Sequence, residues 1–145
     1  MGLLAAFRRR PFLTETEREQ LADGLAHACR HAGAPIGLRI DERASGDPEA
    51  RARLLFEEWA IPTDQRPRAI LIYACGATHR FAVVGGEEVR RVAPAAFWEQ
   101  VHVELQRHFD DERYCDGLFK AIAQVAIQFQ HHFASSAPEE PSGSV

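Results

Sequence analysis

The sequence predicts an α/β fold, a three-layer α/β/α sandwich in which a small mixed sheet has helices on both faces. Three observations support this prediction. A strand–helix–strand order predicts two parallel strands joined by a right-handed crossover. The second of these strands is followed by a tight turn and a third strand, which adds an antiparallel hairpin. Helical segments before and after this region can then cover both faces of the sheet.

Helical spacing near the start of the chain predicts a first helix over residues 14–32. Thr14 and Glu17 form a capping-box pattern, and Gly33 is a typical stop. Between them, leucine and alanine recur three and four residues apart. Residues 36–41 then alternate apolar residues with others, which predicts a half-buried strand.

The segment after this strand predicts the crossover helix. Asp47 is a typical N-cap and Pro48 suits the first helical position, so we expect a helix from Pro48 to Trp59. We expect it to bury the apolar side chains Leu54, Leu55, Phe56 and Trp59. Residues 61–68 contain two prolines and predict a loop.

A hairpin follows this loop. Residues 69–74 are nearly all apolar, which predicts a central strand covered on both faces. Residues 76–78 predict a tight turn into a strand over residues 80–84, which Gly85 and Gly86 end.

Two long helices complete the predicted domain. The first begins at Pro94, buries Phe97, Val101 and Leu105, and is broken at residues 110–112. The second, residues 114–133, is expected to bury Leu118, Ile122, Val125, Phe129 and Phe133. The folded domain is thus predicted to span residues 12–133, with a flexible basic N-terminus at 1–11 and a disordered tail at 134–145.

Length and composition restrict the class of protein. The chain has 145 residues, the ordinary size of one domain, and its net charge of −4 argues against a dedicated nucleic-acid binder. No apolar segment approaches the roughly 20 residues of a membrane span. Three cysteines without a close pair favour a reducing compartment. We therefore expect a cytoplasmic protein with no transmembrane segment and no nucleic-acid partner.

Common catalytic motifs are absent from the sequence. It has neither a phosphate-binding glycine loop with Lys-Ser/Thr nor a Gly-x-Ser-x-Gly elbow. Cys75 and Arg80 are separated by four residues, whereas a cysteine phosphatase loop needs five. Cys115 begins the last helix, where the dipole favours a thiolate, but nearby carboxylates oppose it. The catalytic residues therefore stay unknown, and whether the chain is an enzyme stays open.

Carboxylates are the strongest candidates for a site. Asp64 precedes the second strand, and Glu87 and Glu88 follow the third, so the hairpin brings all three to one end of the sheet. Asp110 and Asp111 join them if the turn between the last two helices reaches that end. Such oxygen-rich clusters suit Ca²⁺ or Mg²⁺. The alternative is a solvated acidic rim, neutralised by neighbouring arginines: Arg66, Arg68, Arg90 and Arg91.

Several segments together resemble the TPM domain family, and its stand-alone bacterial members in particular. They lie between residues 12 and 133 and include the strands 69–74 and 80–85, the Val92-Ala93-Pro94 turn with Phe97-Trp98, and Asp116-Gly117-Leu118. The resemblance implies an α/β/α sandwich. It also implies divalent-cation binding through acidic loop residues in some members, often of Ca²⁺. Some members are called phosphatases, and others have roles that resemble partner binding.

This sequence departs from the family pattern at two positions. The family usually has Asn-Gly or Asp-Asn-Gly before the second strand, where this chain has Arg68-Ala69. Many stand-alone members have Gly-Asp-x-Gly after the third strand, where this chain has Gly85-Gly86-Glu87-Glu88. Arg68 would repel a cation, and Gly86 replaces a carboxylate. We therefore expect the cation site to be weak or absent.

Two functions remain. The first is a TPM-type interaction module that binds an unknown protein partner, with a degenerate cation site. The second is a Ca²⁺- or Mg²⁺-dependent phosphatase, in which the ion would activate a water to attack a phosphate ester. Its candidate ligands are Asp64, Glu87, Glu88, Asp110 and Asp111.

Overall fold

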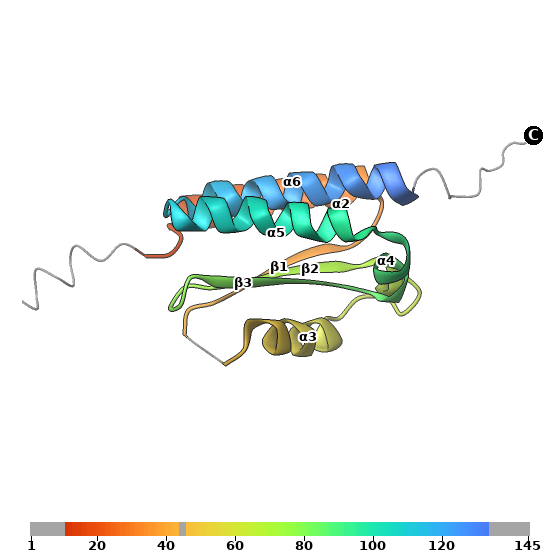
Figure 1. Cartoon of the computed structure of the whole chain (residues 1–145), viewed down its shortest axis with the longest axis horizontal. Coiled ribbons are helices and arrows are strands. Elements are labelled where there is room, and N and C mark those ends of the chain that lie inside the picture. The colour runs from red at the N-terminus through yellow and green to blue at the C-terminus, as the bar shows by residue number, and fades with distance from the viewer. Residues whose placement is uncertain (1–10, 44–45, 134–145) are drawn as a thin grey trace, which may run out of the picture.

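The computed structural model describes residues 11–43 and 46–133 and contains three strands with helices on both faces (Figure 1). The elements in chain order are α2 (Glu15–Ala32), β1 (Ile36–Asp41), α3 (Pro48–Glu58), the 3-10 turn η1 (Arg66–Arg68), β2 (Ile70–Cys75), β3 (Arg80–Gly85), α4 (Glu87–Val92), α5 (Ala95–Asp110) and α6 (Tyr114–Phe133). Helices α2, α5 and α6 cover one face of the sheet and α3 covers the other. The predicted three-layer α/β/α sandwich is confirmed.

The sheet has the order β1-β2-β3, with β1 and β2 parallel and β2 and β3 antiparallel. All residues of β2 are buried, because the central strand has helices on both faces. Ile70, Ile72 and Ala74 belong to the core under α2, α5 and α6, whereas Leu71 and Tyr73 belong to the core against α3. This division follows from the two-residue period of a strand.

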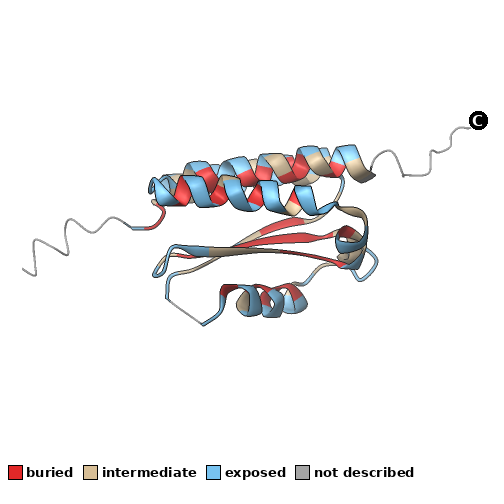
Figure 2. Ribbon diagram, viewed as in Figure 1, coloured by how far each residue is buried: buried red, intermediate tan, exposed pale blue. Residues whose placement is uncertain are grey.

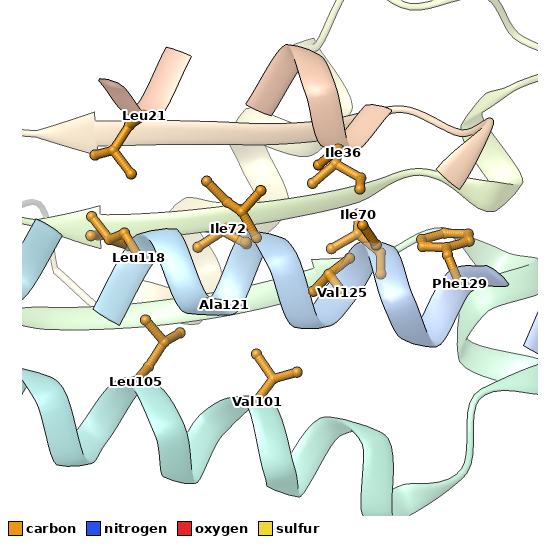
Figure 3. Packing of buried hydrophobic residues seen from close by; sticks show 14 of the residues in the cluster. Leu21, Ile36, Ile70, Ile72, Val101, Leu105, Leu118, Ala121, Val125 and Phe129 are labelled. Atoms are coloured by element: carbon orange, nitrogen blue, oxygen red, sulfur yellow. The ribbon is translucent and has the colours of Figure 1, made fainter. Parts of the chain in front are cut away.

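The larger core lies between the sheet and the three-helix layer (Figure 3). The inner sides of these helices are buried and their outer sides are exposed (Figure 2). The buried positions predicted for the last two helices are confirmed for Phe97, Val101, Leu105, Leu118, Ile122, Val125 and Phe129. The side chain of Phe133 lies outside the described residues.

Helix α3 packs differently from the prediction. Ala52, Leu55 and Phe56 are buried, but Leu54 is 49% exposed, so its predicted burial is wrong. Successive helical residues are 100° apart, so Leu54, Leu55 and Phe56 cannot all face the sheet. Trp59 is half-buried and packs against Gly37 of β1, where a Cβ would lie 2.8 Å from its ring.

The segment after β3 is helical, although the sequence analysis assigned no helix or strand to it. Helix α4 has six residues, with glutamates in its first turn and arginines in its last, as the helix dipole favours. Val89 is its one buried residue. Residues 66–68, predicted as loop, form η1.

The two ends of the described chain lie at opposite ends of the sheet (Figure 1). The chain enters beside the β2–β3 turn, where the Phe12 ring packs against Tyr114 with centroids 4.8 Å apart. It leaves at the end of α6, on the side of α4. The predictions for residues 1–10 and 134–145 lie outside the described residues. Among the helices described, none is long and apolar enough to cross a membrane.

Candidate functional site

The predicted carboxylates divide between the two ends of the sheet. Ile70 pairs with Gly85, so the start of β2 and the end of β3 lie together, as the hairpin predicted. Glu87 and Glu88 begin α4 there, and Asp64 lies in the turn before η1. Contacts between η1 and α4 bring these two segments together.

The turn that carries Asp110 and Asp111 lies at the other end. The Tyr114 hydroxyl is 3.1 Å from Nδ1 of His79, which places the α5–α6 turn beside the β2–β3 turn. The structure therefore does not bring the five predicted ligands into one cluster. Among the residues it describes, no group of three or more histidine, cysteine, aspartate or glutamate side chains is arranged to hold a metal ion.

At the α4 end of the sheet, the two arginines of η1 bind different partners. Arg68 Nη2 lies 3.1 Å from Glu88 Oε2, and both side chains are partly exposed. The Arg66 guanidinium donates hydrogen bonds to the carbonyl groups of Phe56, at 2.5 Å, and Trp59. It thereby satisfies carbonyls at the end of α3 and fixes η1 against that helix.

The contact between η1 and Gly86 excludes a side chain at position 86. A Cβ there would lie 2.1 Å from the Arg66 carbonyl oxygen and 2.6 Å from that of Pro67. The aspartate that the family resemblance implies here therefore cannot fit unless the backbone shifts. With Glu88 paired to Arg68 and with Asp110 and Asp111 at the far end, only Asp64 and Glu87 remain near Gly86, which is fewer oxygen ligands than a divalent cation needs.

A pocket of about 340 Å³ opens beside Gly86, between α3, η1 and α4. Its floor includes Phe56 and Val84, and its charged lining consists of Arg53, Arg66, Arg90, Glu57 and Glu87. Arginines outnumber carboxylates in this lining. The pocket is therefore electrostatically unsuited to a bare cation.

A second polar hollow, of about 580 Å³, lies between the β2–β3 turn and the α5–α6 turn. His79, His102, Asp110 and Glu112 line it together with Tyr114. Asp110 accepts a hydrogen bond of 2.9 Å from Gln106 Nε2. Burial raises the pKa of Tyr114, and the charge of Glu112 adds to this effect.

The nearby Cys115 is not activated as a nucleophile. Burial raises the pKa of its thiol, and the charges of Glu17 and Asp116 raise it further. Repulsion by carboxylates was expected from the sequence, although Glu17 was not among the residues foreseen. The thiol form therefore predominates at neutral pH.

One polar cluster is not among the features that the sequence predicted. Asp41 Oδ2 accepts hydrogen bonds from the Tyr73 hydroxyl at 2.8 Å and from Arg51 Nε at 2.9 Å. The hydrogen bond from Arg51 to Asp41 is the main reason why the pKa of Arg51 is raised. The cluster joins β1, β2 and α3. The sequence feature that could have revealed this cluster is the tyrosine inside an apolar strand, because a buried hydroxyl needs a hydrogen-bond partner.

A groove of about 680 Å³ runs between α2 and α6, and we call it the α2–α6 groove. Its lining is mostly apolar and small: Gly24, Ala28, Ile122, Ala123 and Ala126, with Phe119 and Ile127 beside them and Gln20, Asp23, His27 and His31 along α2. Phe119 is 45% exposed and Ile127 is 59% exposed. The sequence feature that could have revealed this groove is the four-residue spacing of Phe119, Ala123 and Ile127. This spacing makes α6 apolar on a second face beside its buried one.

Comparisons with known proteins agree with this architecture. The NMR structure of the BA42 protein from the psychrophilic bacterium Bizionia argentinensis has a TM-score of 0.76 at 19% identity, and the alignment covers 92% of this chain and 94% of that one. The N-terminal domain of a protein from P. gingivalis has a TM-score of 0.65 at 15% identity, covering 83% and 80%.

A third solved structure, the N-terminal domain of the cg2496 protein from Corynebacterium glutamicum, has a TM-score of 0.63 at 10% identity, covering 91% of this chain and 78% of that one. No curated protein matched the sequence. Residues 8–128 match the TPM domain, which is most of the chain. This chain therefore belongs to the TPM domain family.

Proposed function

We propose that this chain is a TPM-type binding module that acts through contacts with protein and folds without a divalent cation. The observation that carries the proposal is the packing of the η1 carbonyl groups onto Gly86, which leaves no room for an acidic side chain. The Arg68–Glu88 pair supports it, because the Arg68 guanidinium already neutralises a carboxylate that a bound cation would otherwise need as a ligand. With both side chains partly exposed, we expect this pair to contribute at most about 1 kcal/mol.

The residues present give a metal-dependent phosphatase little support. Such an enzyme needs several ligands around an ion with an open position for water. Glu87 and Glu88 lie at one end of the sheet, and Asp110 and Asp111 lie at the other. The thiol of Cys115 has a raised pKa, so it offers no ready nucleophile either.

A titration of the full-length chain with Ca²⁺ and with Mg²⁺ tests the proposal. Because a ligand that binds only the folded state must stabilise it, thermal unfolding and amide NMR shifts report binding directly. We expect no saturable change in either measurement up to about 1 mM ion. A phosphate-ester assay under the same conditions is expected to show no turnover.

Two results together would establish the phosphatase instead. These are saturable binding below that concentration and ester hydrolysis that is lost in Glu87→Ala. Glu19→Ala is the matched control, because Glu19 is an exposed glutamate near the start of α2, at the opposite end of the sheet from α4.

We also propose a reducing compartment, the cytoplasm, for this chain. The support is that Cys29, Cys75 and Cys115 are all free thiols in the fold. Each has a structural contact of its own: Cys29 Sγ, for example, donates to the Ile36 carbonyl at 3.2 Å and accepts from its amide at 3.3 Å. Oxidation would disturb this link between α2 and β1.

A further inference from the structure

The α2–α6 groove has a mostly apolar lining, and two large apolar side chains beside it, Phe119 and Ile127, are exposed. We propose that two copies of this chain associate through their α2–α6 grooves about a two-fold axis, with the two α6 helices antiparallel. This inference rests on the proposed function and deepens it, because it names a second copy as a protein partner.

The first argument is the spacing of the exposed residues on α6. Phe119 and Ile127 lie four residues on either side of Ala123, which is about 6 Å in each direction along the helix. A two-fold axis at Ala123 therefore places Phe119 of each copy beside Ile127 of the other. Alanine at the crossing point allows the two helices to approach closely. Such a mutual contact is what an isologous interface requires.

The Phe119 ring is already held in position for this contact. One edge of the ring lies over Gly24 of α2, where a Cβ would be 3.0 Å from Phe119 Cε2. The Phe119 side chain nevertheless remains 45% exposed. Because the ring is held in place, a second copy loses little side-chain entropy when it covers Phe119.

The second argument is charge complementarity along α2. Helices α2 and α6 run in the same direction, since Gly24 meets Phe119 and Gln130 Nε2 donates to the His31 carbonyl at 3.1 Å. His27 therefore lies level with Ala123. Asp23 and His31 lie four residues on either side of His27, so the same axis brings Asp23 of each copy level with His31 of the other. A carboxylate and an imidazole N–H form a favourable pair.

The third argument is size. Helices of 18 and 20 residues are about 27 and 30 Å long, and together they present a face of about 600 Å² per copy. A dimer that covered this whole face would bury at most about 1,200 Å² in total, which is the lower limit for specific interfaces. The dimer is therefore expected to depend on concentration.

Sedimentation equilibrium of the full-length chain tests the dimer. We expect the apparent mass to rise with concentration from 16.2 kDa toward twice that value. Ile127→Glu should raise the dissociation constant by at least about tenfold, because it places a charge in the apolar contact with Phe119 of the other copy. Val103→Glu is the matched control. Val103 is 54% exposed on α5, away from the groove, and its substitution should leave the dimer intact.

A charge exchange tests the direction of packing. Asp23→Lys should weaken the dimer, because it places a second basic group level with His31 of the other copy. Asp23→Lys combined with His31→Glu should restore the dimer, because opposite charges then meet again across the two-fold axis with their order reversed. The two positions are eight residues apart on one helix, so the restored pair cannot form within a single chain.

Two outcomes would overturn the proposal. One is a wild-type chain that stays monomeric up to about 1 mM, which would assign the groove to another occupant, such as an amphipathic helix of a different protein. The other is a dimer that Val103→Glu breaks and Ile127→Glu does not. Either outcome is distinguishable from a failure of the proposed function, which shows as cation binding and ester hydrolysis.

Discussion

Gly86 lies where the chain leaves β3 and enters α4, and the carbonyl groups of Arg66 and Pro67 occupy the space that its side chain would need. Its φ of −70° is open to any residue, so packing rather than backbone conformation requires glycine here. The sequence showed that a family aspartate is missing at this position. Only the fold shows that η1 fills the space that this aspartate would need.

Restoring the family residue tests this interpretation. We expect Gly86→Asp to lower the free energy of unfolding by about 2–4 kcal/mol, because the side chain collides with two carbonyl oxygens and places a charge beside them. Chemical denaturation measures the loss. Gly33→Asn is the control. Its left-handed φ of 69° suits asparagine and nothing lies within 4 Å, so the cost should stay below about 1 kcal/mol.

If Gly86→Asp instead gained stability on addition of Ca²⁺, the excluded-volume argument would be contradicted. The site would then be one substitution away from binding a cation.

Single residues were predictable where a local rule governs them and unpredictable where distant segments meet. Thr14 accepts a hydrogen bond from the Glu17 amide and donates its own amide to the Glu17 side chain, as the capping-box pattern predicted. The Tyr73–Asp41 bond joins residues 32 positions apart, and no local rule specifies that partner.

At the scale of elements, the strands and long helices with a clear apolar pattern were predicted to within about one residue of their ends. The short helical elements α4 and η1 were missed. Helix α4 has six residues, too few to show a helical period. The strands β2 and β3 were found because apolar runs and a tight turn are local features.

The length of α5 explains why the carboxylate site was only partly predicted. Its 16 residues span about 24 Å, whereas the six-residue strands span about 20 Å. A helix that starts at the α4 end therefore carries Asp110 and Asp111 past the opposite end of the sheet. The hairpin brings Glu87 near Asp64, but α5 takes the other two carboxylates away.

Helix α5 also offers a matched pair of substitutions on its two faces. Val101 is fully buried and Val103 is 54% exposed. We expect Val101→Ala to cost about 2 kcal/mol of unfolding free energy, because it leaves a cavity under the sheet. Val103→Ala should change it by less than about 0.5 kcal/mol. Equal effects in urea denaturation would contradict the assignment of the buried face.

At the scale of the whole molecule, the two outer layers are unequal. Three helices cover one face of the sheet through the larger core, and α3 alone covers the other through a smaller one. The buried residues of α3 are Pro48, Ala52, Leu55 and Phe56, and Leu54 adds nothing to this core because it is exposed. Local opening is therefore expected to begin with α3.

Native-state hydrogen exchange measures this difference. Amides in the middle of α3 should be protected at least about tenfold less than those in the middle of α6, because α3 can detach while the larger core stays closed. Helix α2, which packs in the larger core, serves as the internal reference. If α3 and α6 exchanged together only through global unfolding, the two layers would form one cooperative unit.

The placement of the first and last described residues, 11 and 133, has a mechanical consequence. The chain enters beside the start of α2 and leaves from the far end of α6, and these two helices lie side by side in the same direction. Tension between the ends therefore slides one helix lengthwise past the other instead of peeling them apart. All the side chains packed between α2 and α6 share the force at once, so this helix pair is expected to resist stretching as a unit.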